Sequence, residues 1–596
     1  MNNIFKKTVL LLAGAMMAAC SSDDDMVEGG LNQDGALMRT PVTISANYGE
    51  GTKATTRVAY EETGNKISAT WQSGDKLLVV VDGQVSTLTL SSGAGTTSAT
   101  FTGTILHTND LTPTTQLICY VKDQNNQAAV SVHEDGSYTY TDGTLTSQDG
   151  TVGGAASCNV YYGVTHYGDG TNISCNFSVN TSIMKFTVDA PGLTEGQATL
   201  SYKSEGATIA AATFDIAADG TNTVYLAIPA MHLSGAQTLE YKTGDDANAS
   251  VTATAILSET QANFTAGQTY SKRIMVISPA TGEITVPDGV ILCGTGGGRH
   301  RTETNEWVGT LTRVTIADGA TVTFNNLTIA PPYESQYEYK YAGITCAGNA
   351  TINLRGTNIV QANERTEPGI FIPANHTLTI QGTGSLTAKG DCEGSVGGGA
   401  GIGGYYIYGE EYGIGCGHIV INSGTVTAYG NAGCAGIGGG RRASCDGITI
   451  NGGTVTATGD GEAAGIGSGQ LGSCGNITIN GGTVTATGGY SSAGIGSGNE
   501  GSCGNITIAT GITSVTAMQG MKIEGSTDPI GKGFRATGLG TVTFGGVTVF
   551  DGDDWNGPYT DEDYGGLTLS ITEVDVDDNP DSEDWRTVWM LSHETE

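Results

Sequence analysis

The stretch "CGNITINGGTVTATGGYSSAGIGSGNEGS", residues 474–502, is one unit of an internal repeat. Cysteines mark the period at 29-residue intervals, at Cys416, Cys445, Cys474 and Cys503. Asparagines keep the same interval, at Asn422, Asn451 and Asn480. A fixed period of this length is typical of solenoids, in which each repeat forms one layer and contacts only its neighbours.

Each unit contains three extended segments, "NITI", "TVTAT" and "AGIGS", separated by glycine-rich corners. Three strands per turn predict a right-handed parallel β-helix whose coils are hydrogen-bonded to each other about 4.8 Å apart. Because side chains alternate along a strand, one set should point inward: Ile477, Ile479, Val484, Ala486 and Ile495. The intervening threonines should face outward: Thr478, Thr483, Thr485 and Thr487.

Irregular versions of the same unit lie upstream, at 319–329, 342–360 and 368–390. We therefore expect the β-helix to span 282–550. This region resembles the carbohydrate-binding-like repeat modules of gut bacterial surface proteins. The acidic segment 551–596 is expected to form a C-terminal cap or tail that covers the open end of the solenoid.

The first half of the chain consists of short alternating runs bounded by Gly, Asn and Asp, such as "SIMKFTV" at 182–188. Such runs predict strands with one buried face and one solvated face. Together with the distal repeats, they make the protein all-β, with an N-terminal β-sandwich region followed by the solenoid.

Three segments of this half, "TRVAYEETGNKISATWQSGDKL" (56–77), "ATFTG" (99–103) and "FTAGQTYSKRI" (264–274), resemble the Bacteroidales fimbrillin family of surface lipoproteins. The resemblance implies two β-sandwich lobes, 41–180 and 181–278, and an adhesive or structural role. Other fimbrial subunits are then candidate partners. In pilus subunits of that family, cleavage after an Arg near the N-terminus prepares the exchange of strands between subunits. Arg39 and Arg57 are the early candidates here.

The N-terminal stretch "MNNIFKKTVLLLAGAMMAAC" has a basic start, a short apolar run and small residues before Cys20. It has the features of an export signal, over 1–19, and its apolar run, Thr8 to Ala15, is too short to span a bilayer. Its end resembles a bacterial lipobox, which implies acylation of Cys20 and an anchor in outer-membrane lipid. Residues 20–40 would be a lipidated acidic linker, because "SSDDD" resembles a surface-export tag, and the protein would be exposed on the cell surface.

Charge and side-chain chemistry limit the function. A net charge of −34 excludes nucleic acid as a partner, because polyphosphate is repelled. No cofactor or metal is expected, because the four repeat cysteines would lie along a line instead of converging on one ion. Neighbouring cysteines are within disulfide reach, and both disulfides and buried free thiols remain open, with thiols favoured. No pair of carboxylates recurs on the repeat strands, so no catalytic residues are expected.

Two aromatic insertions interrupt the coils and offer candidate glycan-binding residues: Tyr333, Tyr337, Tyr339, Tyr341, Tyr405, Tyr406, Tyr408 and Tyr412. A tyrosine ring presents an apolar face to a sugar and a hydroxyl to its oxygens. The alternative is that these rings pack over the edge of the solenoid.

The sequence thus predicts a non-enzymatic cell-surface lipoprotein, a fimbrial component or adhesin that displays a β-helical arm for attachment to glycans or host surface proteins. One alternative is a glycan-capture accessory protein of a polysaccharide-uptake system. The other is a β-helical enzyme that cleaves polysaccharides.

Overall fold

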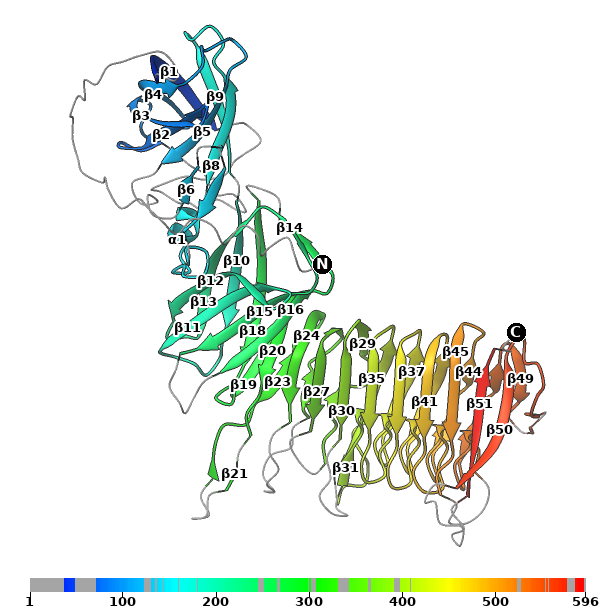
Figure 1. Cartoon of the computed structure of the whole chain (residues 1–596). Coiled ribbons are helices and arrows are strands. Elements are labelled where there is room, and N and C mark those ends of the chain that lie inside the picture. The colour runs from blue at the N-terminus through cyan, green and yellow to red at the C-terminus, as the bar shows by residue number, and fades with distance from the viewer. Residues whose placement is uncertain are drawn as a thin grey trace.

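The computed structural model describes residues 37–48, 71–122, 130–133, 135, 137–141, 143–158, 160–179, 181–244, 251–264, 268–298, 300–301, 307–330, 342–362, 366–390, 397–407, 409–521, 527–552, 554–555, 557–575 and 585–593. Within these residues the fold is all-β apart from the short helix α1 (Val152–Ser157). Two N-terminal lobes lead into a long stack of coils, the solenoid, as the sequence predicts (Figure 1). No helix in the described part of the chain is long and apolar enough to cross a membrane.

Lobe 1 closes into a barrel. Its strands, in barrel order, are β1 (Met38–Tyr48), β4 (Ser98–His107), β3 (Gln84–Ser92), β2 (Lys76–Val81), β5 (Gln116–Lys122), β8 (Tyr161–His166) and β9 (Ile173–Val179). The barrel closes because β1 pairs antiparallel with β4 and parallel with β9. Its core is built around Trp71, whose ring meets Phe101 and Phe177 edge-on at 5.0 and 5.9 Å. The β-sandwich lobe expected here is thus closed into a barrel, which leaves no free strand edge.

Lobe 2 is a sandwich of two sheets. One contains β13 (Thr221–Pro229), β10 (Thr181–Asp189) and β18 (Thr269–Ile277). The other contains β12 (Ala207–Asp215), β11 (Gln197–Ser204), β15 (Gln237–Thr243) and β16 (Thr252–Ser258). Two small antiparallel pairs complete the N-terminal region: β6 (Val130–Val132) with β7 (Tyr138–Tyr140), and β14 (His232–Ser234) with β17 (Gln261–Asn263).

Residues 145–150, which precede β8 in the chain, cover the open edges of both sheets of lobe 2. The Gln148 amide donates to Ala211 and its carbonyl accepts from Thr213, both at 3.0 Å, on β12. Its side chain, which is only 5% exposed, bonds the amide and the carbonyl of Ala227 on β13 at 2.8 and 3.1 Å. This segment therefore satisfies backbone groups on two strand edges that would otherwise be open.

The solenoid has three faces of parallel strands. The first contains the first half of β24 (Ala320–Ile329), β26 (Ala350–Arg355), β29 (Thr377–Gly382), β34 (Cys416–Ile421), β37 (Ser444–Ile450), β40 (Ser473–Ile479), β43 (Ser502–Cys503) with β44 (Ile506–Ile508), and β47 (Gly538–Leu539) with β48 (Val542–Phe544). The second contains the end of β24, β27 (Thr357–Gln361), β30 (Ser385–Lys389), β35 (Thr425–Tyr429), β38 (Thr454–Thr458), β41 (Gly482–Thr487) and β45 (Ile512–Met518).

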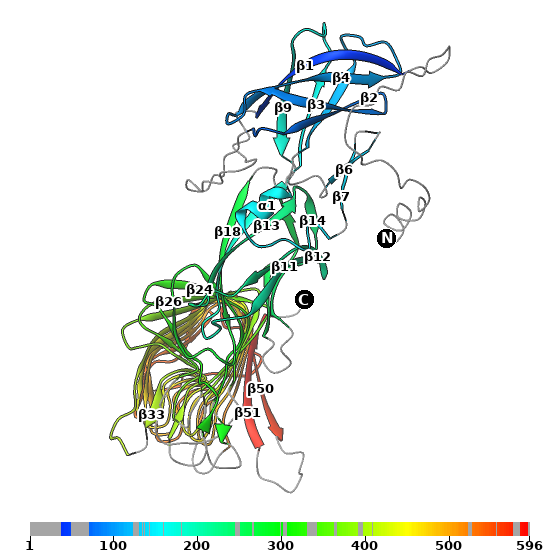
Figure 2. The same cartoon turned by 90° about the vertical axis from the view of Figure 1, so that its left-hand side faces the viewer.

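The third face contains β19 (Glu283–Val286), β23 (Arg313–Ile316), β25 (Ile344–Cys346), β28 (Ile370–Phe371), β32 (Ile402–Gly403), β36 (Ile437–Gly438), β39 (Ile466–Gly467), β42 (Ile495–Gly496) and β46 (Ile530–Gly531). Two antiparallel pairs lie beside it: β21 (His300–Arg301) with β22 (Trp307–Val308), and β31 (Gly397–Gly399) with β33 (Tyr405–Ile407). Figure 2 looks nearly along the solenoid, so that successive coils overlap.

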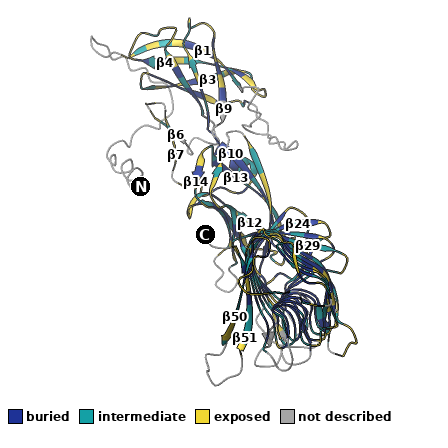
Figure 3. Cartoon of the chain, turned by 90° about the vertical axis from the view of Figure 1, so that its right-hand side faces the viewer, coloured by how far each residue is buried: buried dark blue, intermediate teal, exposed yellow. Residues whose placement is uncertain are grey.

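The 29-residue period becomes registered stacking. Cys416 pairs with Cys445, Cys445 with Cys474, and Cys474 with Cys503, on adjacent strands of the first face. The residues expected to point inward are all fully buried: Ile477, Ile479, Val484, Ala486 and Ile495. The threonines between them are partly exposed. Figure 3, coloured by burial, shows buried residues lining the interior of the coils.

The third face depends on a ladder of glycines. Gly403, Gly438, Gly467, Gly496 and Gly531 stack in register, with φ between 130 and 142°. A Cβ on Gly467 would lie 1.9 Å from the carbonyl oxygen of Gly496 in the next coil. Only glycine allows both this backbone conformation and this contact.

Lobe 2 and the solenoid share one sheet, because β18 pairs in parallel with β20 (Val290–Thr295), which pairs in turn with β24. A second connection joins β16 to the first coils. The buried Asn325 side chain accepts from the Ile256 amide at 2.8 Å and donates to the Ile256 carbonyl at 2.7 Å. Asn326 Nδ2 donates to the Thr254 carbonyl at 3.1 Å. The asparagine side chain thus acts as a strand partner for the edge of β16.

The distal end is covered by β49 (Val547–Phe550), β50 (Thr568–Asp575) and β51 (Trp585–Ser592). Strand β51 pairs antiparallel with β45 on one side and with β50 on the other. Rings of the last coil and the cap meet there: Phe544 lies 5.8 Å from Tyr564 and 6.4 Å from Trp589. These rings cover the apolar interior of the last coil.

Replacing a glycine of the third-face ladder should destabilise the solenoid locally. We expect Gly467→Ala to cost about 2 kcal/mol or more, because the methyl group meets the next coil in a strained conformation. Gly289→Ala is the matched control: φ is also positive, at 75°, but nothing lies within 4 Å of the added carbon, so it should cost only about 1 kcal/mol. Hydrogen–deuterium exchange of the strands around each site measures the difference, with β39 and β42 reporting on Gly467 and β20 and β24 on Gly289, and equal effects would contradict the close-contact explanation.

The last coil of the solenoid should lose stability as the pH rises, because Asp528 lies just before β46. Burial raises the pKa of Asp528 to about 6, although the Lys532 amide and charge oppose the shift. The folded coil therefore favours the protonated carboxyl, so the cost of ionisation should appear between about pH 4 and pH 6 and reach at most about 3 kcal/mol. Asp528→Asn should raise the melting temperature at pH 7.5 and leave it almost unchanged at pH 4. An equal effect at both pH values would contradict this assignment.

Candidate functional site

The structure places only some of the candidate tyrosines. Tyr333, Tyr337, Tyr339, Tyr341 and Tyr408 lie outside the described residues. Tyr405, Tyr406 and Tyr412 belong to the second insertion, which leaves the coil after β32 and returns at β34. Only these three can be judged from their surroundings.

Tyr405 and Tyr406 pack against the solenoid. The Tyr405 ring meets Phe371 edge-on at 5.4 Å, and burial, aided by the charge of Glu367, raises the pKa of Tyr405 to about 12. Tyr406 is 6% exposed, its hydroxyl donates to the Glu410 carbonyl at 3.1 Å, and the Arg441 guanidinium lies 5.4 Å from the ring centroid. The rings of these two residues are thus occupied by protein contacts.

Tyr412 differs, because 71% of it is exposed. It lies close in sequence to Ile414, which is 39% exposed and bridges to Tyr405. Of the three described tyrosines in the second insertion, Tyr412 alone offers a free ring face to a ligand.

The stacked cysteines are buried free thiols, one of the two arrangements that the sequence left open. The Cys416 thiol donates to the Gly438 carbonyl at 3.3 Å. Hydrogen bonding to Cys445 and burial raise the pKa of Cys416 well above its usual value. A thiol held in its protonated form, as at Cys416, is a poor nucleophile and a poor metal ligand. In the described parts of the chain, no group of three or more His, Cys, Asp or Glu residues is placed to hold a metal ion.

The repeat asparagines form an amide ladder at a corner of the solenoid. Asn451 Nδ2 donates to Asn422 Oδ1, and Asn480 Nδ2 donates to Asn451 Oδ1, both at 2.8 Å. The ladder extends upstream through Gln381, which donates to Asn353 at 2.9 Å. Because each amide satisfies its neighbour, this ladder stabilises the stack and leaves little free hydrogen-bonding capacity.

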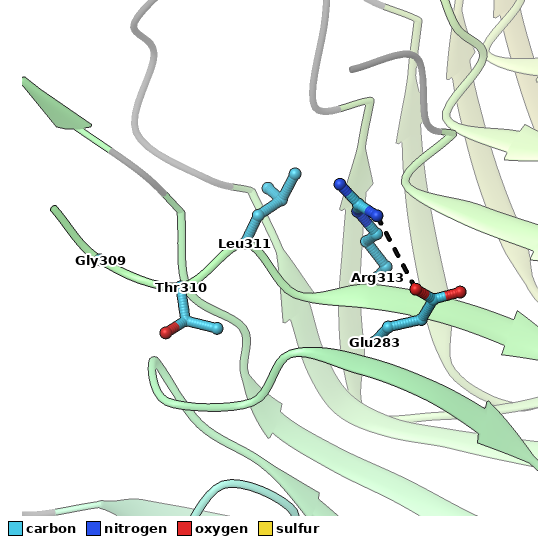
Figure 4. Close-up of a pocket in the computed structure, with 5 residues that line it drawn as sticks. All are labelled: Glu283, Gly309, Thr310, Leu311 and Arg313. Carbon is cyan, nitrogen blue, oxygen red and sulfur yellow. Dashed lines mark ion pairs between the residues drawn. The ribbon is translucent and has the colours of Figure 1, made fainter. Parts of the chain in front are cut away.

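A shallow pocket of about 260 Å³ lies where the solenoid begins, lined by Glu283, Gly309, Thr310, Leu311 and Arg313. Figure 4 shows the Arg313 guanidinium turned toward the Glu283 carboxylate, at 3.8 Å. Glu283 is 73% exposed, so this pair is largely hydrated. The pocket offers one charged pair and little apolar surface.

A larger groove of about 480 Å³ lies between lobe 2 and the second face of the solenoid. We call it the junction groove; its lining residues are Ala236, Ile256, Glu259, Gly356, Thr357, Thr383, Gly384, Ser385 and Thr425. Sequence reasoning missed this groove, because Glu259 and Thr383 are 124 residues apart and only the fold brings them together. The available signal for the groove was the repeated threonines, for which the sequence predicts only that they face outward.

Comparison with known proteins identifies the repeats. The Beta helix repeat model matches residues 419–441, 448–470 and 477–499. The distal half carries beta helix repeats. No curated protein sequence matches the chain significantly.

Solved structures of bacterial proteins described as cell adhesion or fimbrial proteins are similar to part of the chain. A structure described as a cell adhesion protein from Bacteroides ovatus is 16% identical, covers 40% of this chain and 92% of its own, and gives a TM-score of 0.25. The fimbrial anchor protein of Porphyromonas gingivalis is 13% identical, with 34% and 78% covered and a TM-score of 0.20. The tip fimbrial protein of that organism is 9% identical, with 39% and 94% covered and a TM-score of 0.20.

Because Tyr406 is buried and Tyr412 is exposed, replacing each by Ala should change the stability of the protein by very different amounts. Tyr406→Ala should destabilise the protein by about 3 kcal/mol, because it removes a buried ring and leaves a cavity. Tyr412→Ala should change stability by less than about 0.5 kcal/mol, because the ring is exposed. Thermal unfolding measures both, and a glycan array on Tyr412→Ala then tests the insertion as a binding site. Unchanged glycan binding by that variant would remove Tyr412 from the candidates.

Proposed function

We propose that this protein is a non-enzymatic, lipid-anchored surface protein that serves as a fimbrial component or adhesin and displays the solenoid as an arm. The observation that carries this proposal is the continuous sheet that runs from lobe 2 into the coils through β18 and β20. Lobe 1 and the solenoid lie on opposite sides of lobe 2 (Figure 1). An anchor near lobe 1 would therefore leave the distal cap pointing away from the membrane.

The arm is suited to display because it is stiff. Each coil is hydrogen-bonded to the coils before and after it, and the third face contains nine strands within the described residues. At about 4.8 Å per coil, this face extends for about 40 Å. A rigid scaffold of this length holds its outer surface and its inserted loops at a fixed distance from lobe 2.

The anchor in this proposal is acylated Cys20, held in outer-membrane lipid. Its support is the sequence: a basic and then apolar start, small residues before Cys20, and acidic residues after it. The other proposed partners are further fimbrial subunits and a glycan or host surface protein. A net charge of −34 keeps such an exposed protein soluble and disfavours polyanionic ligands.

Acylation and surface exposure can be tested in the native host. We expect Cys20→Ser to abolish incorporation of an alkyne-labelled fatty acid and to release the protein from the outer-membrane fraction, because stable anchoring needs several acyl chains. Ser22→Ala, a neighbouring change, should retain both. Protease treatment of intact cells should remove the wild-type protein. A protected wild-type protein would contradict surface display, and a Cys20→Ser protein that stays membrane-bound would contradict the anchor.

Attachment is tested separately. A strain lacking the protein should adhere less to a mucin-coated surface than the wild type, and the full chain should restore adhesion when Cys20 is intact. Equal adhesion by all strains would argue against the adhesin function.

A further inference from the structure

We propose that the junction groove binds a neutral oligosaccharide. This inference deepens the proposed function, because it gives the displayed arm a ligand class and a site. The groove is formed by two elements distant in sequence: the end of β16 with Glu259 from lobe 2, and the outer side of β27, β30 and β35 from the solenoid. These elements lie side by side where lobe 2 meets the coils (Figure 1).

The walls of the groove are held rigidly. On the lobe 2 side, both backbone groups of Ile256 are bonded to the buried Asn325 side chain, at 2.8 and 2.7 Å. Arg355 Nη1 donates to the Ile256 carbonyl as well, at 3.3 Å. On the solenoid side, Thr357, Ser385 and Thr425 stack in register on adjacent strands. A groove that is already formed avoids the entropy cost of ordering its walls when a ligand binds.

The lining residues supply the hydrogen-bonding groups that a sugar requires. Four residues with hydroxyls line the groove, Thr357, Thr383, Ser385 and Thr425, and each hydroxyl can accept from a ligand. The hydroxyls of Thr357, Ser385 and Thr425 can also donate. Glu259 accepts from the Thr383 hydroxyl at 2.5 Å and keeps further acceptor capacity for donors of a ligand. Ile256 and Ala236 add the apolar surface against which C–H groups of a sugar ring can pack. A volume of about 480 Å³ is within the range of small-molecule sites.

Charge selects among ligands that could use these groups. The groove contains a single carboxylate and no cationic side chain among its lining residues, and the whole protein carries −34. An acidic polysaccharide would be repelled. A basic peptide could pair with Glu259, but the four hydroxyls outnumber that one charge. A neutral, hydroxyl-rich ligand matches the lining best.

The same row of hydroxyls continues out of the groove along the solenoid. Thr425 pairs with Thr454, Thr454 with Thr483, and Thr483 with Ser514. A chain that enters the groove therefore meets a further hydroxyl about every 4.8 Å along the solenoid. We expect hexasaccharides to bind more tightly than disaccharides of the same sugar.

The test uses the full mature chain and isothermal titration calorimetry. The probes are disaccharides and hexasaccharides of glucose, mannose, galactose and xylose, with hexagalacturonate and octalysine as charged comparators. Ser385→Trp should fill the groove and abolish binding, and Glu259→Gln with Thr357→Val should weaken it about tenfold or more through lost hydrogen bonds. Thr507→Trp is the matched control, because Thr507 is an outward threonine of β44 on the first face. It should leave affinity unchanged, and thermal unfolding verifies that all variants fold.

Three results would overturn the inference: no neutral probe binds at millimolar concentration, Ser385→Trp binds as well as Thr507→Trp, or octalysine binds in preference and is blocked by Ser385→Trp. The last result would assign the groove to a basic peptide. The proposed function fails independently, through loss of surface exposure or adhesion in the cell assays. Binding by a protein that is not displayed would leave the groove intact and remove the adhesin function.

Discussion

The close contact between coils on the third face constrains the rest of the solenoid. Gly438, Gly467 and Gly496 bring each coil so close to the next that a Cβ would lie about 2 Å from a carbonyl oxygen. This contact fixes the distance between coils and their rotational register. Once both are fixed, the paired positions of the regular coils fall over their equivalents 29 residues away. The ladders on the other two faces follow from that register.

A stacked position must be compatible with a copy of itself above and below, and each ladder satisfies this condition in its own way. Isoleucines and valines fill the interior as one continuous buried core. Cysteines stack as small buried thiols. A side-chain amide is both a donor and an acceptor, so stacked asparagines can hydrogen-bond to each other, as Asn422, Asn451 and Asn480 do. Threonines fit the outer face because a hydroxyl can also do both. Like charges at such positions would repel, which explains the small number of charged residues on the repeated strands.

Structural features that recur in every repeat could be predicted from the sequence, whereas features that occur once in the chain could not. The 29-residue period correctly predicted that the cysteines stack. The alternation of side chains correctly predicted which residues of the unit 474–502 point inward. The closure of lobe 1 could not be predicted, because it depends on β1 pairing with β9 more than 120 residues later. The strand-edge contacts of the segment around Gln148 could not be predicted either, because they also join residues far apart in the sequence. Tyr405 and Tyr412 lie in one short insertion of similar composition, yet one is packed and the other is 71% exposed. Tyr405 packs against Phe371, a neighbour from another coil that the sequence alone does not place beside it.

The junction between lobe 2 and the solenoid is where an arm of this kind has most need of reinforcement. Tension along the solenoid axis is transmitted from coil to coil through inter-strand hydrogen bonds, so the interface with the fewest bonds opens first. At the junction, β18 and β20 supply only one registered strand pair. Asn325, Asn326 and Arg355 add side-chain bonds to the backbone of β16, at Ile256, Thr254 and Leu257 respectively. These residues extend the interface onto the second sheet of lobe 2, so that load is carried by both sheets of the sandwich. The junction groove lies beside this reinforced interface, where the bonds between Asn325 and Ile256 join its lobe 2 wall to the solenoid.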